Sequence, residues 1–236
     1  MIKKPYKLYW PEKNNFGDII TKNIFKYFDI PYEHNNKLYT VLCVGSIVDR
    51  ARPKHIILGS GLLDEKIKFK KDADFRFVRG PLTRQRIIDA GGHCPEIYGD
   101  PALLLPFFCD ESAKAYDVGM VPHYTDYKYF VEKFPDYKII DVINKDPLAV
   151  AREITKCRTI ISSSLHGLIC AHAYGIPAAW VRLNKKSPLT KFKFKDYYQS
   201  VGLPFDRPYY DLEEIRFHKG IVPDLSPIKE KFLELK

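Results

Sequence analysis

The sequence predicts an α/β protein built from two Rossmann-like halves that face a cleft. Short apolar runs alternate with stretches of helical pattern, as expected for buried parallel strands joined by helices. The same alternation occurs on both sides of a polar stretch at residues 109–116. A single doubly wound sheet is the alternative, because 236 residues can form one domain or two.

The first half contains four predicted strands, each a short apolar run. They are Lys7–Trp10, Thr40–Val44, His55–Leu58 and Phe75–Val78. Two helical stretches follow the first and the fourth strand, at Asp18–Phe28 and Pro81–Ala90. Proline is tolerated in a first helical turn, and a pair of glycines stops the second helix. We therefore predict an N-terminal Rossmann-like domain over residues 1–112.

The second half repeats this order. Its predicted strands are Val118–Val121, Tyr137–Val142, Thr159–Ile161 and Ala178–Val181. Its predicted helices are Tyr127–Phe134, Pro147–Lys156, Leu165–Tyr174 and, after a stretch rich in Lys, Tyr, Phe and Pro, Ser226–Leu235. We predict a C-terminal Rossmann-like domain over residues 113–236 that includes this last helix, which can pack back on the body of the protein.

Composition narrows the class of partner. The net charge of +9 favours an acidic partner, which can be a phosphorylated small molecule, an anionic membrane face or nucleic acid. A basic surface that is merely solvated is the alternative. No run approaches the ~18 apolar residues of a membrane-spanning helix, and no apolar segment follows the N-terminal lysines. We therefore expect a cytoplasmic protein.

Several common motifs are absent. The sequence has no Walker loop, GxGxxG, HExxH or GxSxG, which argues against a P-loop NTPase, a dinucleotide oxidoreductase, a zincin and an α/β-hydrolase. Its five cysteines are irregularly spaced and form no CxxC pair, so we expect buried, reduced thiols and no zinc site.

The most specific candidate site is the run Ser162–Gly167. A predicted strand ends in three serines, and a helix begins immediately with Leu165 and His166. The free N–H groups and the positive dipole of a helix start attract phosphate or carboxylate. A histidine in the first turn adds a titratable group. The alternative is an ordinary capped helix with an incidental histidine.

A second candidate lies after the first strand. Asn15 precedes Phe16, Gly17 and Asp18, where a helix is expected to begin. Asp18 suits a helix N-cap, and Gly17 lets the backbone approach a ligand closely. An ordinary capped turn between strand and helix is the alternative.

Two further candidates lie at predicted strand ends. Arg79 follows the fourth strand, where open α/β sheets bind ligands, and arginine grips carboxylates and phosphates with two N–H groups. A structural salt bridge is the alternative. His123 follows the first strand of the second half. Asp100 precedes an apolar run and is expected either to hold a partner arginine or to cap the next helix.

Lysines alternate with aromatic residues over 184–198, and Lys191 lies in this run. Such a run can steer an anionic substrate, contact a membrane peripherally or bind single-stranded nucleic acid. A solvated loop is the default interpretation. The candidate substrate-binding residues are Asn15, Gly17, Asp18, Gly59, Ser60, Ser162, Ser163, Ser164, Leu165 and Lys191, and the candidate catalytic residues are His166, Arg79 and His123.

The order of these motifs resembles the polysaccharide pyruvyl transferase family over about residues 14–202. The series is Asn15–Asp18, Gly59–Gly61, Arg79–Pro81, Gly99–Pro101, Pro122–His123, Ser162–Gly167 and Ala173–Pro177. The resemblance implies a compact GT-B-like fold, phosphoenolpyruvate as donor and no metal or organic cofactor. The acceptor it implies is a sugar of a surface polysaccharide or of its lipid-linked precursor, which receives pyruvate as a ketal.

The resemblance also assigns roles to residues. Arg79, Leu165 and His166 match the donor-site positions of the family. Many members carry arginine just before the Leu-His pair, whereas this sequence has Ser164. A lysine from the 185–195 run can replace that arginine. Otherwise the chain binds the donor more weakly or catalyses a different reaction. A histidine of near-neutral pKa can supply the proton that enol chemistry needs.

Two other functional classes remain open on the sequence. A GT-B glycosyltransferase that uses a nucleotide sugar shares the architecture, but we find no glutamate-containing sugar-nucleotide motif in the second half. A nucleic-acid-binding module would account for the charge, yet the basic run is local. We therefore predict a pyruvyl transferase without a nucleic-acid partner.

Overall fold

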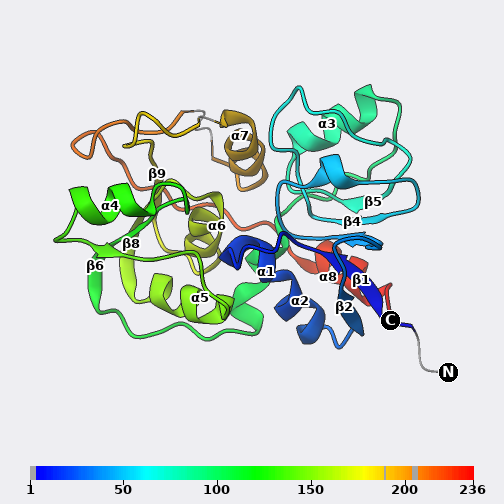
Figure 1. Ribbon diagram of the computed structural model, residues 1–236, viewed down its shortest axis with the longest axis horizontal. Coiled ribbons are helices and arrows are strands. Elements are labelled where there is room, and N and C mark those ends of the chain that lie inside the picture. The colour runs from blue at the N-terminus through cyan, green and yellow to red at the C-terminus, as the bar shows by residue number, and fades with distance from the viewer. Residues whose placement is uncertain (1–3, 189, 204–206) are drawn as a thin grey trace.

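The computed structural model describes residues 4–188, 190–203 and 207–236, and it contains two parallel sheets (Figure 1). The first sheet has the order β2-β1-β3-β4-β5. Its strands are β1 (Tyr6–Tyr9), β2 (Tyr32–His34), β3 (Val41–Leu42), β4 (Ile56–Leu58) and β5 (Asp74–Phe77). The strand β2 was not predicted. It is a short edge strand of polar residues, Tyr-Glu-His, and so lacks the apolar pattern of a buried strand.

The second sheet has the order β7-β6-β8-β9 and is also parallel throughout. Its strands are β6 (Tyr116–Val121), β7 (Lys138–Ile139), β8 (Cys157–Ser162) and β9 (Ala178–Trp180). Two parallel sheets with their helices confirm the predicted α/β class and are compatible with two Rossmann-like halves. The boundary at residue 112 and the GT-B-like arrangement stay predictions.

Helices of the first half follow the prediction with small shifts. They are α1 (Phe16–Ile19), α2 (Thr21–Tyr27) and α3 (Pro81–Asp89), with short 3-10 segments η1 (Val48–Arg50) and η2 (Pro101–Phe107). The single helix predicted from Asp18 thus begins earlier and divides at Ile20. The η2 segment carries the apolar run after Asp100, whose Oδ1 accepts a hydrogen bond from the Ala102 amide at 3.0 Å and so caps it.

The second half contains α4 (Tyr127–Lys133), α5 (Pro147–Thr155), α6 (Leu165–Ala173), α7 (Lys191–Ser200) and α8 (Ser226–Leu233). The default interpretation of the Lys/aromatic run as a solvated loop is wrong for residues 191–198, which belong to α7. Phe194, Tyr197 and Tyr198 are buried on one face of α7, at the i, i+3 and i+4 spacing of a helix. Phe194 stacks on Trp180 of β9 with ring centroids 4.1 Å apart.

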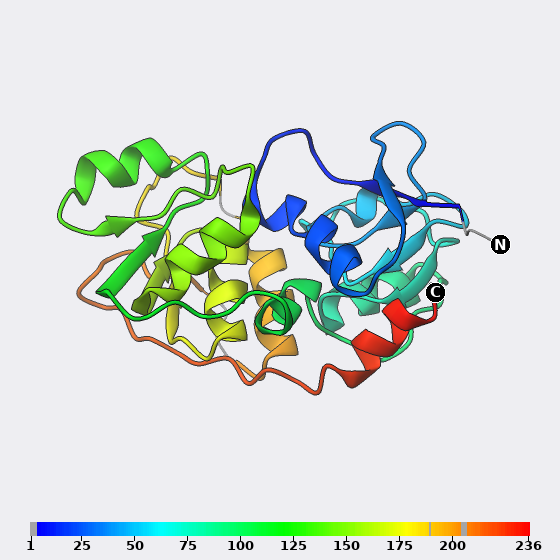
Figure 2. The same ribbon diagram turned by 90° about the horizontal axis from the view of Figure 1, so that it is seen from below.

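The C-terminal segment crosses back to the first half and ends in α8 against the first sheet (Figure 2). Phe232 stacks on Phe28 at 4.8 Å and meets the edges of Phe25 and Phe77 at 5.9 and 6.0 Å. Arg76 of β5 forms an ion pair with Glu234 at 2.8 Å. One hydrophobic core therefore includes residues of both halves and of the last helix.

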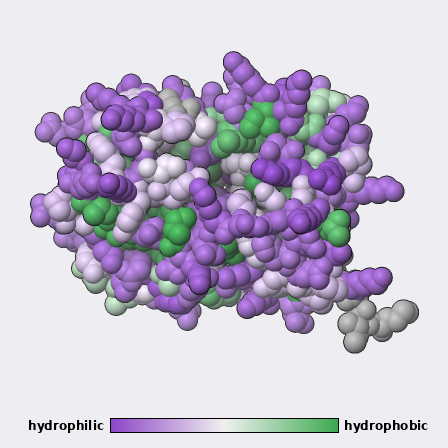
Figure 3. Space-filling view, in the orientation of Figure 1, coloured by the Kyte–Doolittle hydropathy of each residue, from purple (hydrophilic) through white to green (hydrophobic). Residues whose placement is uncertain are grey.

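The surface agrees with the composition. The face in Figure 3 is mainly hydrophilic, with only small apolar patches. Within the described part of the chain, no helix combines the length and the apolar character needed to cross a bilayer. All five cysteines are buried and free, as predicted.

We expect Phe232→Ala to destabilise the protein by about 3–5 kcal/mol, because it leaves a cavity among three aromatic rings. Urea unfolding followed by fluorescence measures this change. The control is Leu233→Ala, since Leu233 is 50% exposed and its loss should barely move the midpoint. Equal effects of the two substitutions would show that α8 does not pack as described.

Candidate active site

A cavity of about 540 Å³ lies between the two halves, at the carboxyl ends of strands from both sheets. Ligands of open α/β sheets bind at this edge. Segments that follow β1, β3, β6, β8 and β9 contribute to its wall, together with α7. The residues that line it include Asn15, Asp18, Ser46, Arg50, His123, Asp126, Ser163, Ser164, Leu165, His166, Arg182 and Lys193.

The three serines before α6 have different partners. Ser162 is fully buried and its hydroxyl contacts the carbonyl oxygens of Val121 and Ser164, both at 2.7 Å, so it shapes the turn. Ser163 donates to Asp126 at 3.0 Å and accepts from the His123 amide at 2.9 Å. Ser164 is the N-cap residue, and no side chain caps the helix there. The Ser164 N–H is used by the Ser162 hydroxyl at 3.0 Å. The N–H groups available to a ligand at this end of α6 are therefore those of the first helical turn, which begins at Leu165.

His166 lies in the first turn of α6 against Gly17. A Cβ at residue 17 would overlap the imidazole ring, so glycine is required for this approach. His166 Nε2 lies 3.6 Å from Asp100 Oδ2, and both atoms are buried without a hydrogen bond. Because a buried unpaired polar atom is costly, a proton on Nε2 would satisfy both atoms once they approach slightly.

Asp18 and Lys193 form the polar floor of the cavity. Asn15 donates to Asp18 at 2.8 Å, and burial raises the pKa of Asp18 above its usual value. The pKa of Lys193 is lowered to about 8, mainly by burial and also by the positive charge of Arg79, while Asp18 partly opposes both effects. Among the described residues, the Lys193 ammonium has no hydrogen bond or ion pair, so it is available to an anion.

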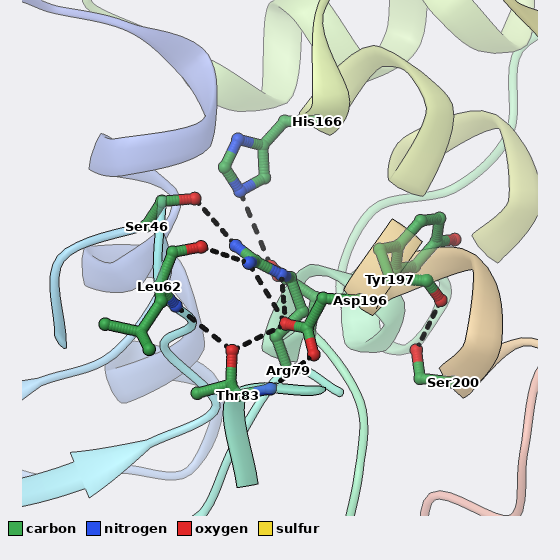
Figure 4. A network of polar contacts seen from close by, with 9 residues as sticks. Ser46, Leu62, Arg79, Thr83, His166, Asp196, Tyr197 and Ser200 are labelled. Atoms are coloured by element: carbon green, nitrogen blue, oxygen red, sulfur yellow. Dashed lines mark hydrogen bonds and ion pairs between the residues drawn. The ribbon is translucent and has the colours of Figure 1, made fainter. Parts of the chain in front are cut away.

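Arg79 lies behind the cavity wall. Its side chain is fully buried and donates to Ser46 and to the Leu62 carbonyl, both at 2.7 Å (Figure 4). It also pairs with Asp196 of α7 at 3.1 Å. Asp196 accepts two further bonds from Thr83, at 2.7 and 2.8 Å. The guanidinium thus contacts Ser46, which lines the cavity, but does not line it itself; a direct contact of Arg79 with substrate stays a prediction.

His123 lines the cavity from the second half. Its Nδ1 lies 2.7 Å from the Thr125 hydroxyl and accepts the Thr125 amide at 3.5 Å. Burial lowers its pKa to about 4, and the nearby charge of Lys193 contributes. The ring is therefore neutral at pH 7 and, with Nδ1 as acceptor, carries its proton on Nε2.

The structure brings most predicted site residues together, and it places some elsewhere. Asn15, Asp18, His123, Ser163, Ser164, Leu165 and His166 line the cavity, with Gly17 directly behind. Gly59 adopts φ +81° against Phe77 and Pro101, and Ser60 donates to the Cys43 carbonyl at 2.6 Å, both away from the cavity. Lys191 is exposed at the start of α7 and is not part of the lining.

Lys191 was the predicted substrate-binding lysine, but Lys193 is the lysine that lines the cavity. The signal that distinguishes them is helical spacing, because Lys193 precedes the buried Phe194 and lies one turn before the buried Asp196. Asp126 and the pairing of Asp100 with His166 were also missed. Asp126 accepts bonds from Ser163, Asn184 and Ser187, a set that forms only when separate loops meet.

Comparison with known proteins gives a family match. A sequence model of the polysaccharide pyruvyl transferase family matches residues 4–184. The succinoglycan biosynthesis protein ExoV of Rhizobium meliloti is 28% identical over 221 residues, which is 86% of this chain and 66% of that protein. An uncharacterized protein of Acanthamoeba polyphaga mimivirus is 34% identical over 178 residues, 70% of this chain and 61% of that protein. The chain thus spans under two thirds of these curated relatives. No solved structure gives a significant match.

We expect Asp196→Asn to destabilise the protein by about 3–5 kcal/mol, because it leaves the buried Arg79 charge without its counter-ion. Denaturant unfolding measures the loss. The control is Glu132→Gln, which removes an exposed ion pair with Lys128 and should leave the midpoint almost unchanged. A wild-type midpoint for Asp196→Asn would show that the pair carries little of the stability.

Stability should fall as the pH drops from about 6.5 to about 4. Burial lowers the pKa of His172 and of His123 to about 4, whereas an unfolded histidine titrates near 6.5. In this window the unfolded chain binds protons that the folded chain does not, so acid favours unfolding. Urea midpoints at pH 7, 6 and 5 measure the slope.

The variant His172→Asn isolates one histidine in this experiment. Asparagine can keep the hydrogen bond that His172 Nδ1 makes with the Tyr197 hydroxyl at 3.0 Å. The variant should lose less stability than wild type between pH 7 and 5. The raised pKa of Asp18 acts in the opposite direction in both proteins and cancels in the comparison. Identical slopes would contradict the assignment to His172.

Proposed function

We propose that this chain, which belongs to the polysaccharide pyruvyl transferase family, transfers the pyruvyl group of phosphoenolpyruvate to a sugar of a polysaccharide or of its lipid-linked precursor. The family match over residues 4–184 confirms the resemblance that the ordered motifs predicted. The observation that carries the proposal is the cavity in which the start of α6, His166 and the unpaired Lys193 meet.

The cavity suits a small, densely negative donor. Phosphoenolpyruvate carries a carboxylate and a phosphate. The N–H groups in the first turn of α6, at Leu165 and His166, can bind one anionic group, and Lys193 can bind the other. Arg50 and Arg182 add positive charge to the same wall. Lys193 therefore takes the place of the arginine that many family members carry at the position of Ser164, since both residues line this cavity.

The transfer has a definite proton balance. A sugar hydroxyl adds to C2 of the enol while C3 receives a proton and becomes the methyl group. Phosphate then leaves C2 with the bonding electron pair, and a second hydroxyl of the same sugar adds to C2 and closes the ketal ring. The two hydroxyls release two protons. One is equivalent to the proton that C3 gains, and the other is taken up by the departing phosphate. A group that both donates and accepts a proton serves each step.

His166 is positioned to donate and accept the protons of this transfer. It lines the cavity beside the start of α6, and Asp100 faces its Nε2 from behind. Asp100 acts as a positioning residue, because its Oδ1 is fixed in the η2 cap and its Oδ2 remains for the imidazole. His123 is neutral and is oriented by Thr125. It can therefore donate a hydrogen bond from Nε2 to the acceptor sugar or to phosphoenolpyruvate.

Phosphoenolpyruvate should raise the melting temperature of the wild type at pH 7. At ten times its Kd the gain is about 1.4 kcal/mol, or roughly 3–6 °C for a chain of this size. Lys193→Met should lose most of this shift. Because the pKa of Lys193 is about 8, the wild-type shift should also shrink at pH 9, where the amine is mostly neutral.

Lys191→Met is the matched control, since it removes the same charge from the exposed start of the same helix. It should keep the full shift. Loss of the shift in Lys191→Met but not in Lys193→Met would contradict the proposed donor site. A shift with UDP or GDP and none with phosphoenolpyruvate would favour a glycosyltransferase instead.

A further inference from the structure

A second cavity, of about 720 Å³, lies in the first half among η1, the segment 67–70 and α3. It contains five basic side chains and one acidic side chain. The charged lining residues are Arg50, Arg52, Lys68, Lys70, Arg86 and Asp49. Arg50 also lines the candidate active site, but the other four basic residues do not, so the donor site does not explain most of this charge.

Most of this charge has no counter-ion in the protein. Arg50 lies 3.8 Å from Asp49, a weak exposed pair. Across the described parts of the chain, no ion pair involves Arg52, Lys68, Lys70 or Arg86. The Arg86 Nε atom is buried and has no hydrogen bond. Like charges gathered in a concave surface repel one another and raise the local positive potential, and a bound anion would relieve this repulsion.

The floor of the same cavity is apolar and aromatic. Ile67, Phe69 and Tyr39 line the cavity together with the basic side chains, and the Arg52 guanidinium lies 5.6 Å from the Tyr39 ring centroid. Arginine binds phosphate with two parallel N–H groups, while rings and aliphatic carbons pack against the uncharged part of a ligand. The cavity therefore fits an organic phosphate better than a bare inorganic ion.

Arg50 lines both this cavity and the candidate active site. The two cavities therefore share one basic side chain, and an acceptor that bridged them would place its sugar in one and its anionic group in the other. We propose that the second cavity binds the phosphate or diphosphate through which the acceptor sugar is attached to its carrier. The proposal rests on the proposed function and specifies the acceptor as a carrier-linked saccharide.

The first test uses inorganic pyrophosphate as probe and isothermal titration calorimetry as readout. The variant is Arg52→Gln/Lys70→Gln, which should bind pyrophosphate at least tenfold more weakly than wild type. The matched control is Lys128→Gln/Lys133→Gln on α4, which removes two charges from an exposed helix far along the chain and should leave the affinity unchanged. Circular dichroism and melting curves confirm that each variant is folded.

The donor site is tested separately in the same proteins. Arg52→Gln/Lys70→Gln should keep the melting shift with phosphoenolpyruvate, and Lys193→Met should keep the binding of pyrophosphate. Pyrophosphate binding that disappears in Lys193→Met and survives in Arg52→Gln/Lys70→Gln would place the anion in the donor site and overturn the inference. The donor site itself would remain supported in that case.

Farnesyl diphosphate and UDP then identify the carrier. A lipid carrier predicts that farnesyl diphosphate binds more tightly than pyrophosphate, and a nucleotide carrier predicts the same of UDP. In either case the gain should disappear in Arg52→Gln/Lys70→Gln. If neither compound binds more tightly than pyrophosphate, the cavity does not recognise a carrier-linked group and the proposal is overturned.

Discussion

The buried ion pair between Arg79 and Asp196 determines how the candidate active site is assembled. Arg79 follows β5 of the first sheet and Asp196 lies on α7 of the second half, so the pair joins the two halves directly behind the cavity. A Cβ at Gly80 would overlap the Asp196 backbone, so the two segments touch. Burying both charges is tolerated because Ser46, Leu62 and Thr83 satisfy their remaining hydrogen bonds.

This pair also places Lys193. Asp196 and Lys193 are three positions apart on α7 and therefore lie on neighbouring parts of one helix face. With Asp196 held at Arg79, Lys193 points into the cavity beside Asp18. The proximity of Arg79 then helps to lower the pKa of Lys193. A structural ion pair thus sets both the position and the charge of a ligand-facing lysine.

Burial shifts the pKa values of three groups in the cavity. Burial raises the pKa of Asp18 and lowers the pKa values of Lys193 and His123, so in each case the charged form is disfavoured. A bound carboxylate or phosphate would reverse this for Lys193. Arg50 lines both this cavity and a second basic one, so the two positively charged surfaces share one residue.

The sequence by itself determined the elements that depend on local pattern. Short apolar runs predicted eight of the nine strands found in the described residues. The serine run before His166 predicted a helix start, and α6 does begin there, at the wall of the cavity. These succeed because strand burial and helix capping depend on neighbouring residues. The exposed strand β2 and the helix α7 were not predicted. The residues of β2 are polar, and the lysines of α7 made its buried aromatic face hard to recognise in the sequence.

The tertiary structure alone decided which side chains meet. Arg79 and Asp196 are separated by 117 positions, and Asp100 and His166 approach only because η2 packs against α6. It also decided that Lys193, and not Lys191, enters the cavity, and that α8 returns to the first sheet. Such contacts depend on how distant segments pack, and a residue type at a strand end does not reveal whether its charge will meet a ligand or a buried counter-ion.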